Sequence, residues 1–228
     1  MQEAVATRVR EGGAERLLLL EHDPVYTIGR RGTTDHLLVG PEVLRADGAS
    51  VYRVDRGGDI TYHGPGQLVG YPITAFAEGA DLVGYVRAIE EALRDALASY
   101  GVPSRTEHGK TGVWVDLQGG RPAKIAAIGV RISRGVTSHG FALNVSTDLA
   151  AFDRVLPCGF QHEVASLERL GVVADVSAVG ERCARALAAQ LGRELIVDAS
   201  VEPPRDAEIP MGAPVRAALD LLTEPLPA

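Results

Sequence analysis

The 228-residue sequence predicts an α+β fold, with a mixed, mostly antiparallel sheet flanked by helices. Short segments with strand-like patterns follow one another at hairpin distance, and most end at glycine or proline. Two longer segments carry apolar residues at helical spacing. No internal repeat or clear linker divides the chain, so we expect one domain over residues 1–228 with an irregular, proline-rich tail from about residue 200.

The predicted strands are alternating or uniformly apolar and are bounded by turn residues. They cover Leu17–Glu21, Val25–Ile28, Ser50–Arg56, Asp59–His63, Leu68–Ile73, Thr111–Leu117, Ala123–Ser133, Val136–Ser146 and Glu194–Val197. Turns at Gly119–Gly120 and Arg134–Gly135 join three of these segments in succession, which favours antiparallel hairpins.

The clearest predicted helix begins at Asp81, a favourable N-cap, and ends before Gly101. Its apolar residues recur on one side, and its charged residues lie on the other. A second helix is expected from about Asp175 to Gln190. Shorter helices are expected at Leu149–Phe152 and, within the tail, near Val215–Leu222.

Composition and charge exclude several classes of protein. The net charge of −7 argues against a nucleic-acid binder, and no apolar run reaches the ~20 residues of a membrane helix. The apolar run near the N-terminus is too short for a secretory signal. The two cysteines suggest neither a disulfide framework nor a zinc site, and the histidines lack metal-ligand spacing. We therefore expect a cytoplasmic protein without a metal.

Cys158 is the strongest candidate nucleophile. It lies in the turn sequence LPCGF, between Pro157 and Gly159. On such a turn a thiolate is accessible, and nearby backbone N–H groups can stabilise an oxyanion. The alternative is a small buried residue, an interpretation that suits Cys183, which falls in the apolar row of its predicted helix.

Lys124 is the expected partner of Cys158. Of the 23 basic residues only Lys110 and Lys124 are lysine, and Lys124 lies in the apolar segment AKIAAIGV. Arginine stays protonated, whereas a partly desolvated lysine can release and regain a proton. Its ammonium would also favour the thiolate of a neighbouring cysteine. The alternative is a strand-end lysine that reaches water.

The glycine-rich stretch RGGDITYHGPGQLVGYPI, residues 56–73, is a candidate binding segment. A strand follows its G-x-G, so it is not a dinucleotide fingerprint. Glycine allows backbone to approach a ligand closely, and the polar neighbours can orient it. The alternative is that these glycines only form turns. His63 and His139 are further candidates for proton transfer, although neither has a third residue marked by spacing.

Three blocks together resemble the lipoyl(octanoyl) transferases, the octanoyl-carrier-protein:protein N-octanoyltransferases of lipoate synthesis. They are RGGDITYHGPGQLVGYPI, then AKIAAIGVRIS with HGFALNVSTDL, then LPCGF, and LLLLEHDPVYTIGRR resembles the family's opening strand and turn. The resemblance spans roughly residues 17–168. It implies the fold of biotin and lipoate protein ligases, with an acyl tunnel over the sheet.

Residue by residue, the resemblance implies that Cys158 carries the acyl thioester and that Lys124 lowers its pKa. The implied substrate contacts lie in three segments. They are Arg56, Gly57, Gly58, Asp59, Ile60, Thr61, Tyr62 and His63; Ala127, Ile128 and Gly129; and Gly140, Phe141 and Ala142. Where other members carry a serine or another small residue, this chain has Ala127, which preserves a backbone contact but no hydroxyl contact.

The implied reaction transfers an octanoyl or lipoyl group to a lysine without ATP or any cofactor. The implied donor is octanoyl-acyl carrier protein, and the acceptors are lipoyl domains of 2-oxoacid dehydrogenases and the glycine-cleavage H protein. Leu117–Thr147 contains arginines and Lys124 but no acidic residue, and Arg30 and Arg31 lie in another acid-free stretch. We expect these basic residues to form a docking rim for acidic partners, and we expect a monomer.

Other functions stay open at this point. An ATP-dependent lipoate or biotin protein ligase would share the fold but need a nucleotide site and no nucleophilic cysteine. A lipoyl-domain-binding module would share the fold without catalysis. A cysteine hydrolase, using a histidine with Cys158, is the weakest alternative because it needs an open, wet site.

Overall fold

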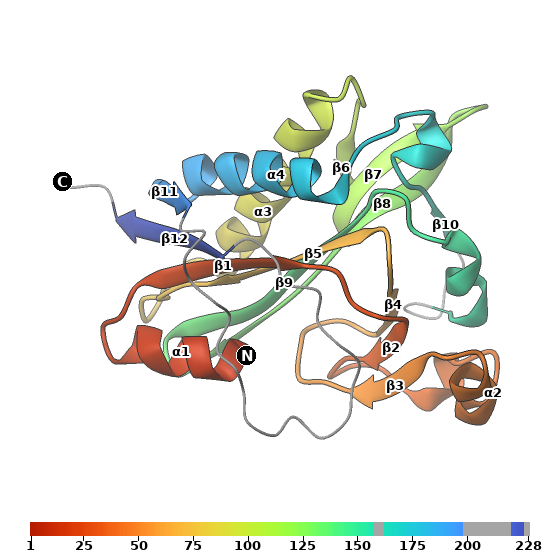
Figure 1. Ribbon diagram of the computed structural model, residues 1–228, viewed down its shortest axis with the longest axis horizontal. Coiled ribbons are helices and arrows are strands. Elements are labelled where there is room, and N and C mark those ends of the chain that lie inside the picture. Colours follow the sequence, from red (N-terminus) through yellow and green to blue (C-terminus); the bar gives the residue numbers. More distant parts are fainter. Residues whose placement is uncertain (157–161, 198–219, 226–228) are drawn as a thin grey trace.

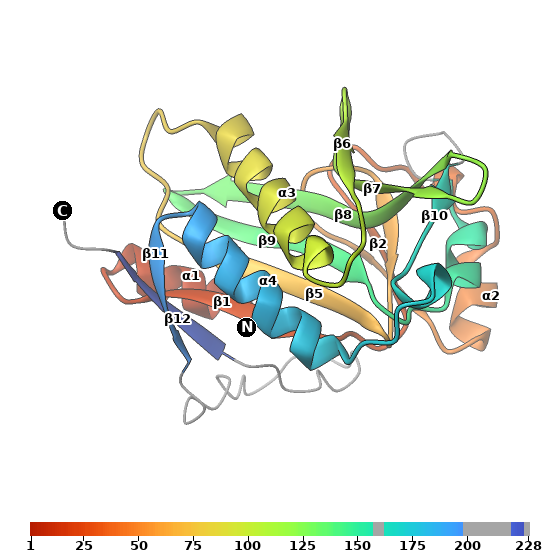
Figure 2. The same cartoon turned by 90° about the horizontal axis from the view of Figure 1, so that it is seen from above.

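The computed structural model describes residues 1–156, 162–197 and 220–225, and it contains two sheets with helices packed on them. The large sheet forms the middle layer. Helices α3 (Leu82–Ala98) and α4 (Val176–Gln190) cover one face, and α1 (Gln2–Arg10) covers part of the other (Figures 1 and 2). The small sheet lies on the same side as α1. No helix in these described ranges is long and apolar enough to cross a membrane.

The large sheet is ordered β11-β12-β1-β5-β9-β8-β7-β6, and β10 pairs with β8 beside this path. Every pairing is antiparallel except that of β10 with β8. The strands are β1 (Glu15–Leu20), β5 (Gln67–Ile73), β6 (Arg105–Glu107), β7 (Lys110–Leu117), β8 (Arg121–Ser133), β9 (Val136–Asn144), β10 (Glu163–Val164), β11 (Arg193–Val197) and β12 (Asp220–Pro225).

The small sheet has the order β3-β2-β4 and supports the glycine-rich stretch. Its strands are β2 (Val25–Ile28), β3 (Ser50–Arg53) and β4 (Ile60–His63). Helix α2 (Pro41–Ala46) contributes Leu44 to the core of this unit, and the 3₁₀ helix η2 (Leu149–Arg154) packs Phe152 against that core. The remaining short 3₁₀ helices are η1 (Thr34–His36) and η4 (Glu168–Leu170).

The main core lies between the large sheet and helices α3 and α4. Ile89 and Leu93 of α3 and Leu187 of α4 meet Ile125 and Leu143 of the sheet, and all of these are almost fully buried. Asp81 is the N-cap of α3, as predicted, and Asp175 is the N-cap of α4, where its carboxylate accepts a hydrogen bond from the Ala178 N–H. Apolar burial on this face therefore holds the sheet that carries the candidate site.

The predicted α+β class and the predicted strands and main helices are confirmed within one to three residues at most of their ends. Helices α1 and α2 and strands β6 and β10 were not predicted, because each is short or presents only a narrow apolar stripe. The helix predicted near residues 215–222 is wrong for its last residues, because Asp220–Pro225 forms strand β12 between β1 and β11. The tail is therefore not irregular throughout.

Truncation of Ile125 tests the importance of the main core. Ile125 is fully buried between the sheet and α3, so Ile125→Ala should lower the free energy of unfolding by about 2–5 kcal/mol. Chemical denaturation measures this value. The matched control is Val173→Ala, which removes a side chain that is 96% exposed and should change stability by no more than about 0.5 kcal/mol. Equal effects of the two substitutions would contradict this account of the core.

Candidate functional site

The glycine-rich stretch joins the small sheet to the large one. The Arg30 and Arg31 N–H groups after β2 donate to the Arg56 and Gly58 carbonyls, and the Gly57 N–H donates to the Val130 carbonyl of β8 at 3.1 Å. Arg56 is itself buried, and its guanidinium donates to the Thr27 carbonyl at 2.6 Å. The glycine-rich stretch, which the sequence predicts to bind a ligand, is therefore fixed against β8.

The three segments predicted to contact substrate are adjacent. An added Cβ on Gly129 would lie 2.8 Å from the Gly57 carbonyl oxygen, so a side chain there has no room. Gly129 lies opposite Gly140, and Ala127 lies opposite Ala142. The glycine-rich stretch thus meets β8 at Arg56 and Gly57, and residues 127–129 of β8 lie beside residues 140–142 of β9.

Alternation along the strands divides the predicted contacts into two groups. Ala127, Gly129, Gly140 and Ala142 share the face that meets the glycine-rich stretch. Ile128 and Phe141 point the other way, into the core under α3 and α4. Any contact of these two residues with a ligand on the site face is therefore limited to their backbone.

Several predicted contacts in residues 56–63 also have structural roles. Ile60 and Tyr62 are buried in the core of the small sheet. Asp59 is buried as well, and its Oδ2 lies 2.6 Å from Nδ1 of His36. Gly58 has φ +88, which favours glycine. These residues therefore help to fix the conformation of the stretch itself.

Lys124 is half-buried in β8, between the fully buried residues Ala123 and Ile125. Its Nζ lies 4.8 Å from the centroid of the Trp114 ring, a cation–π arrangement. A β-bulge between Val113 and Trp114 places Trp114 opposite Lys124. The partly buried, apolar surroundings that the sequence predicts for Lys124 are therefore present in the structure.

Gly112 lies beside the Lys124 side chain, and its backbone conformation and the neighbouring Ala126 carbonyl require glycine. It has φ +119, and an added Cβ would lie 3.5 Å from Cε of Lys124 and 2.5 Å from the Ala126 carbonyl oxygen. Its N–H donates to the fully buried Glu90 carboxylate of α3 at 2.9 Å. Helix α3 thereby anchors the bulge that brings Trp114 to Lys124.

Cys158 lies outside the described residues, so its distance from Lys124 stays a prediction. The chain on either side of it is placed. The Leu156 N–H donates to the His36 carbonyl at 2.9 Å. After the undescribed residues, the His162 ring lies 5.3 Å from the Trp114 ring, and Val164 of β10 lies opposite Lys124. His162 and Val164, which follow Cys158 closely in the sequence, thus lie next to Trp114 and Lys124.

The predicted histidines occupy different places. His63 is buried, and its Nδ1 lies 2.7 Å from Oε1 of Gln67. Burial lowers the pKa of His63 to about 3, so its ring is neutral at pH 7. Burial also lowers the pKa of His22, whose ring lies 5.7 Å from that of His63. The neutral His63 ring can accept a hydrogen bond, but a pKa of about 3 makes it a weak proton acceptor at pH 7.

His139 does not accompany Lys124. It lies opposite Val130, six residues further along β8, which corresponds to about 20 Å of strand. Its Nε2 lies 2.7 Å from Asp55 Oδ1, and its φ of +57 is unusual for a residue other than glycine. Burial lowers its pKa, and the Asp55 carboxylate opposes that shift.

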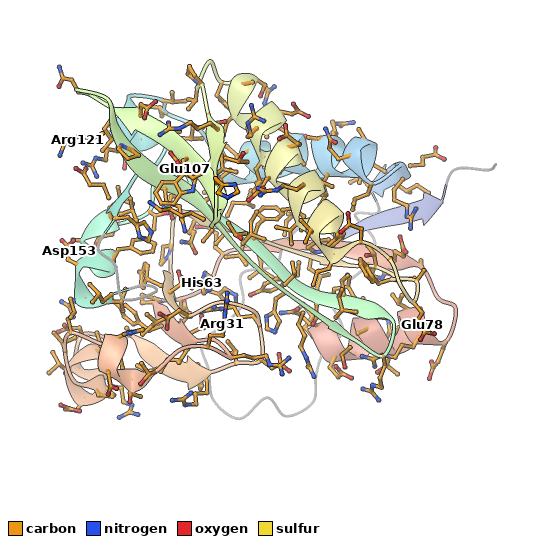
Figure 3. The ribbon with its side chains drawn as sticks, turned by 180° about the vertical axis from the view of Figure 1, so that it is seen from behind. Arg31, His63, Glu78, Glu107, Arg121 and Asp153 are labelled. Carbon is orange, nitrogen blue, oxygen red and sulfur yellow. The ribbon has the colours of Figure 1, made fainter. Side chains whose placement is uncertain are left out.

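The expected basic docking rim is largely neutralised. Arg121 pairs with Glu163, Arg131 with Asp55, and Arg134 with Glu3. These acidic partners lie far from the arginines in the sequence, so an acid-free segment does not produce a basic surface. Arg30 and Arg31 are exposed, and Figure 3 shows Arg31 well away from Arg121.

The sequence interpretation missed Trp114, Asn144 and the role of Gln67. Gln67 Nε2 donates to Asn144 Oδ1 at 2.9 Å, and all three side chains are buried. Trp114 and Asn144 are the only tryptophan and asparagine of the chain. Rarity of a residue type, the signal that singled out Lys124, would have singled out these two as well.

Cys183 has the structural role predicted for it. Its side chain is buried in the main core, and this burial raises the pKa of its thiol to about 12. A thiol with so high a pKa is a poor nucleophile at neutral pH.

The pKa of His63 predicts how stability depends on pH. Its pKa is lower in the folded protein than in the unfolded chain, so the unfolded chain binds a proton first as the pH falls. His63 should therefore lower stability by up to about 1.4 kcal/mol per pH unit below about pH 6.5, until its folded pKa is reached. Urea unfolding at several pH values measures this slope, which should be shallower in His63→Gln. Identical slopes in both proteins would contradict the burial of a neutral His63.

Comparison with known proteins identifies a family and several relatives of this chain. Residues 1–188 match the family model of the lipoyl protein ligase A/B catalytic domain. An octanoyltransferase of Solibacter usitatus is 49% identical over 203 residues, which cover 88% of this chain and 90% of that protein. An octanoyltransferase of Mycobacterium leprae is 50% identical over 177 residues, 75% of this chain and 74% of that protein.

Solved structures show the same fold at low sequence identity. A bipartite lipoate protein ligase from Thermoplasma acidophilum superposes with a TM-score of 0.67 at 18% identity, covering 83% of this chain and 78% of that one. Lipoate-protein ligase A bound with ATP superposes with a TM-score of 0.58 at 20% identity, covering 83% and 80%. The match over residues 1–188 and the identity to the curated relatives establish that this chain belongs to the lipoyl protein ligase A/B catalytic domain family.

Proposed function

We propose that this chain is an octanoyltransferase that moves an octanoyl group from acyl carrier protein to a lysine of a lipoyl domain, through a thioester on Cys158. Relatives that share about half of its sequence carry the name octanoyltransferase. One observation from the fold carries the proposal furthest. Lys124 is held in an apolar strand against Trp114, and the segment that follows Cys158 in the sequence pairs with β8 there.

The first half of the proposed reaction forms the acyl-enzyme. The Cys158 thiolate attacks the thioester carbonyl, and backbone N–H groups stabilise the resulting oxyanion. The carbonyl carbon then forms a bond to the Cys158 sulfur and loses its bond to the carrier sulfur. The carrier thiolate takes a proton from the Lys124 ammonium, which leaves Lys124 neutral.

The second half transfers the acyl group to the acceptor. The acceptor lysine amine attacks the acyl-enzyme, and neutral Lys124 takes the proton that the amine releases. An amide bond forms, the bond to the Cys158 sulfur breaks, and the thiolate and ammonium are restored. Because a thioester supplies the acyl group, the reaction needs no ATP.

The small residues of β8 and β9 are the proposed floor for the acyl chain. Ala127, Gly129, Gly140 and Ala142 share one face and have little or no side chain. Removing about seven apolar carbons from water at ~0.8 kcal/mol each contributes roughly 5 kcal/mol to binding. A dry site also protects the acyl-enzyme from hydrolysis.

The proposed acceptors are lipoyl domains, including those of 2-oxoacid dehydrogenases and the glycine-cleavage H protein, and the proposed location is the cytoplasm. The ion pairs of Arg121, Arg131 and Arg134 shift the expected docking charge to the exposed Arg30 and Arg31 beside the glycine-rich stretch. Arginines that are exposed in the folded protein suit an acidic partner.

An ATP-dependent lipoate ligase is the alternative within the same fold, since ligases have this architecture. Such an enzyme forms an acyl-adenylate rather than a cysteine thioester. The relatives that carry the name octanoyltransferase favour a transfer reaction over ligation. A covalent adduct therefore distinguishes the two reactions.

Intact-mass spectrometry tests the proposal. After incubation with octanoyl-carrier protein and no acceptor, the protein should gain one octanoyl group, and peptide mapping should place it on Cys158. Cys158→Ala should lose the adduct and reduce transfer by at least about 10³-fold. Lys124→Met should retain the thiol but acylate more slowly, by about 10²–10⁴-fold.

Cys183→Ala is the matched control, because it removes the other thiol, which is buried and unreactive. It should keep both the adduct and the rate. Full transfer by Cys158→Ala, or transfer that requires ATP and releases pyrophosphate, would refute the proposed reaction.

A further inference from the structure

A chain of buried hydrogen bonds runs from β4 to the junction of β8 and β10. His63 Nδ1 lies 2.7 Å from Gln67 Oε1, and Gln67 Nε2 donates to Asn144 Oδ1 at 2.9 Å. Asn144 Nδ2 donates to the Ala165 carbonyl at 3.0 Å, and the Ala165 N–H donates to the Lys124 carbonyl at 2.9 Å. This chain ends on the lysine of the proposed reaction.

Two backbone carbonyls, those of Ala165 and Tyr62, determine how the Asn144 and Gln67 side-chain amides are oriented. The Ala165 carbonyl can only accept, so the Asn144 amide group must present its NH₂ to it and its oxygen to Gln67. Gln67 Nε2 also donates to the Tyr62 carbonyl at 3.3 Å. Gln67 Oε1 therefore faces His63, which must carry its proton on Nδ1 and leave Nε2 unprotonated.

Asn144 lies where the large sheet divides. Strands β8 and β9 pair from Ser133–Val136 as far as Ala126–Leu143, and beyond that point β10 pairs with β8 at Ala123 and Lys124. At this division the Asn144 side chain bonds to Ala165, and the Asn144 carbonyl accepts the Leu167 N–H at 3.2 Å. One residue of β9 thus holds the segment that runs out of β10.

We propose that Asn144, oriented by Gln67, is a positioning residue for Lys124 and acts through the backbone of Ala165. The proposal rests on the role of Lys124 in the proposed function. The oxygen and the nitrogen of the Asn144 side-chain amide are both hydrogen-bonded, so neither aspartate nor leucine can replace this residue. Aspartate loses the donor to Ala165, and leucine loses both bonds while keeping a similar volume.

A mainly structural role is the competing explanation, because loss of a buried hydrogen bond destabilises any fold. Strand β9 provides a matched control at its other end. Thr137 is fully buried, and its hydroxyl donates to the Pro72 carbonyl at 2.8 Å and receives the Thr74 N–H at 2.9 Å. Thr137 lies opposite Ile132, far along β8 from Lys124. Thr137→Val therefore removes comparable bonds from the same strand without touching Lys124.

The experiment compares Asn144→Asp, Asn144→Leu and Thr137→Val with the wild-type protein. Thermal unfolding selects the folded variants. For the Asn144 variants, kcat of octanoyl transfer should fall by about 10–100-fold while KM for the carrier changes by no more than about threefold. Alkylation of Cys158 by iodoacetamide at pH 7 should slow toward the rate of an ordinary thiol. Thr137→Val should lower the melting temperature but keep kcat and the alkylation rate.

Amide hydrogen exchange provides a readout that does not depend on the reaction. The Ala165 N–H should exchange faster in the Asn144 variants than in the wild type, and it should be unchanged in Thr137→Val. Wild-type kcat and Ala165 exchange in folded Asn144 variants would overturn the positioning role. An equal loss of kcat in Thr137→Val at equal stability would do the same. Failure of the proposed function would instead appear as activity in Cys158→Ala, whatever the exchange result.

Discussion

The pairing of β10 with β8 at Lys124 is the constraint on which the account of this molecule depends. Strand β8 changes neighbours at this point, because β9 pairs with it only as far as Ala126. The change brings a segment that is distant in sequence beside a lysine whose side chain lies over Trp114. Helix α3 supports the other side of the lysine, because Glu90 accepts a hydrogen bond from Gly112, next to the bulge between Val113 and Trp114. The burial of Ala123 and Ile125 under α3 and α4 therefore fixes the position of the Lys124 amine on the opposite face of the sheet.

Two different kinds of contact build the two sides of the site. Apolar packing against helices fixes the large sheet, whereas backbone hydrogen bonds fix the glycine-rich stretch against β8. The close approach of Gly57 and Gly129 excludes side chains from the contact between them. The site face carries the small residues Ala127, Gly129, Gly140 and Ala142, while the bulky residues of the same strands, Ile128 and Phe141, belong to the core. Alternation along two strands thus separates binding from stability.

Much of the fold and part of the site could be predicted from the sequence. Periodicity and N-caps identified α3 and α4 because long amphipathic helices carry strong local signals. The two-residue strand β10 carries no such signal, since its position depends on β8, which is forty residues away. The predicted basic rim is largely neutralised for the same reason. Arg131 and Arg134 pair with Asp55 and Glu3, which are distant from them in the sequence. Lys124 was identified by its rarity and apolar setting, whereas the buried amides of Gln67 and Asn144 become meaningful only once their partners are known.

The most direct test of the central claim is a crystal structure of the protein acylated by an octanoyl donor in the absence of acceptor. The account predicts continuous density for an octanoyl thioester on Sγ of Cys158, with Nζ of Lys124 within about 4 Å of that sulfur. The chain should extend over Ala127 and Ala142. An acyl group attached elsewhere, or a Lys124 amine on the far side of Trp114 from the sulfur, would contradict it.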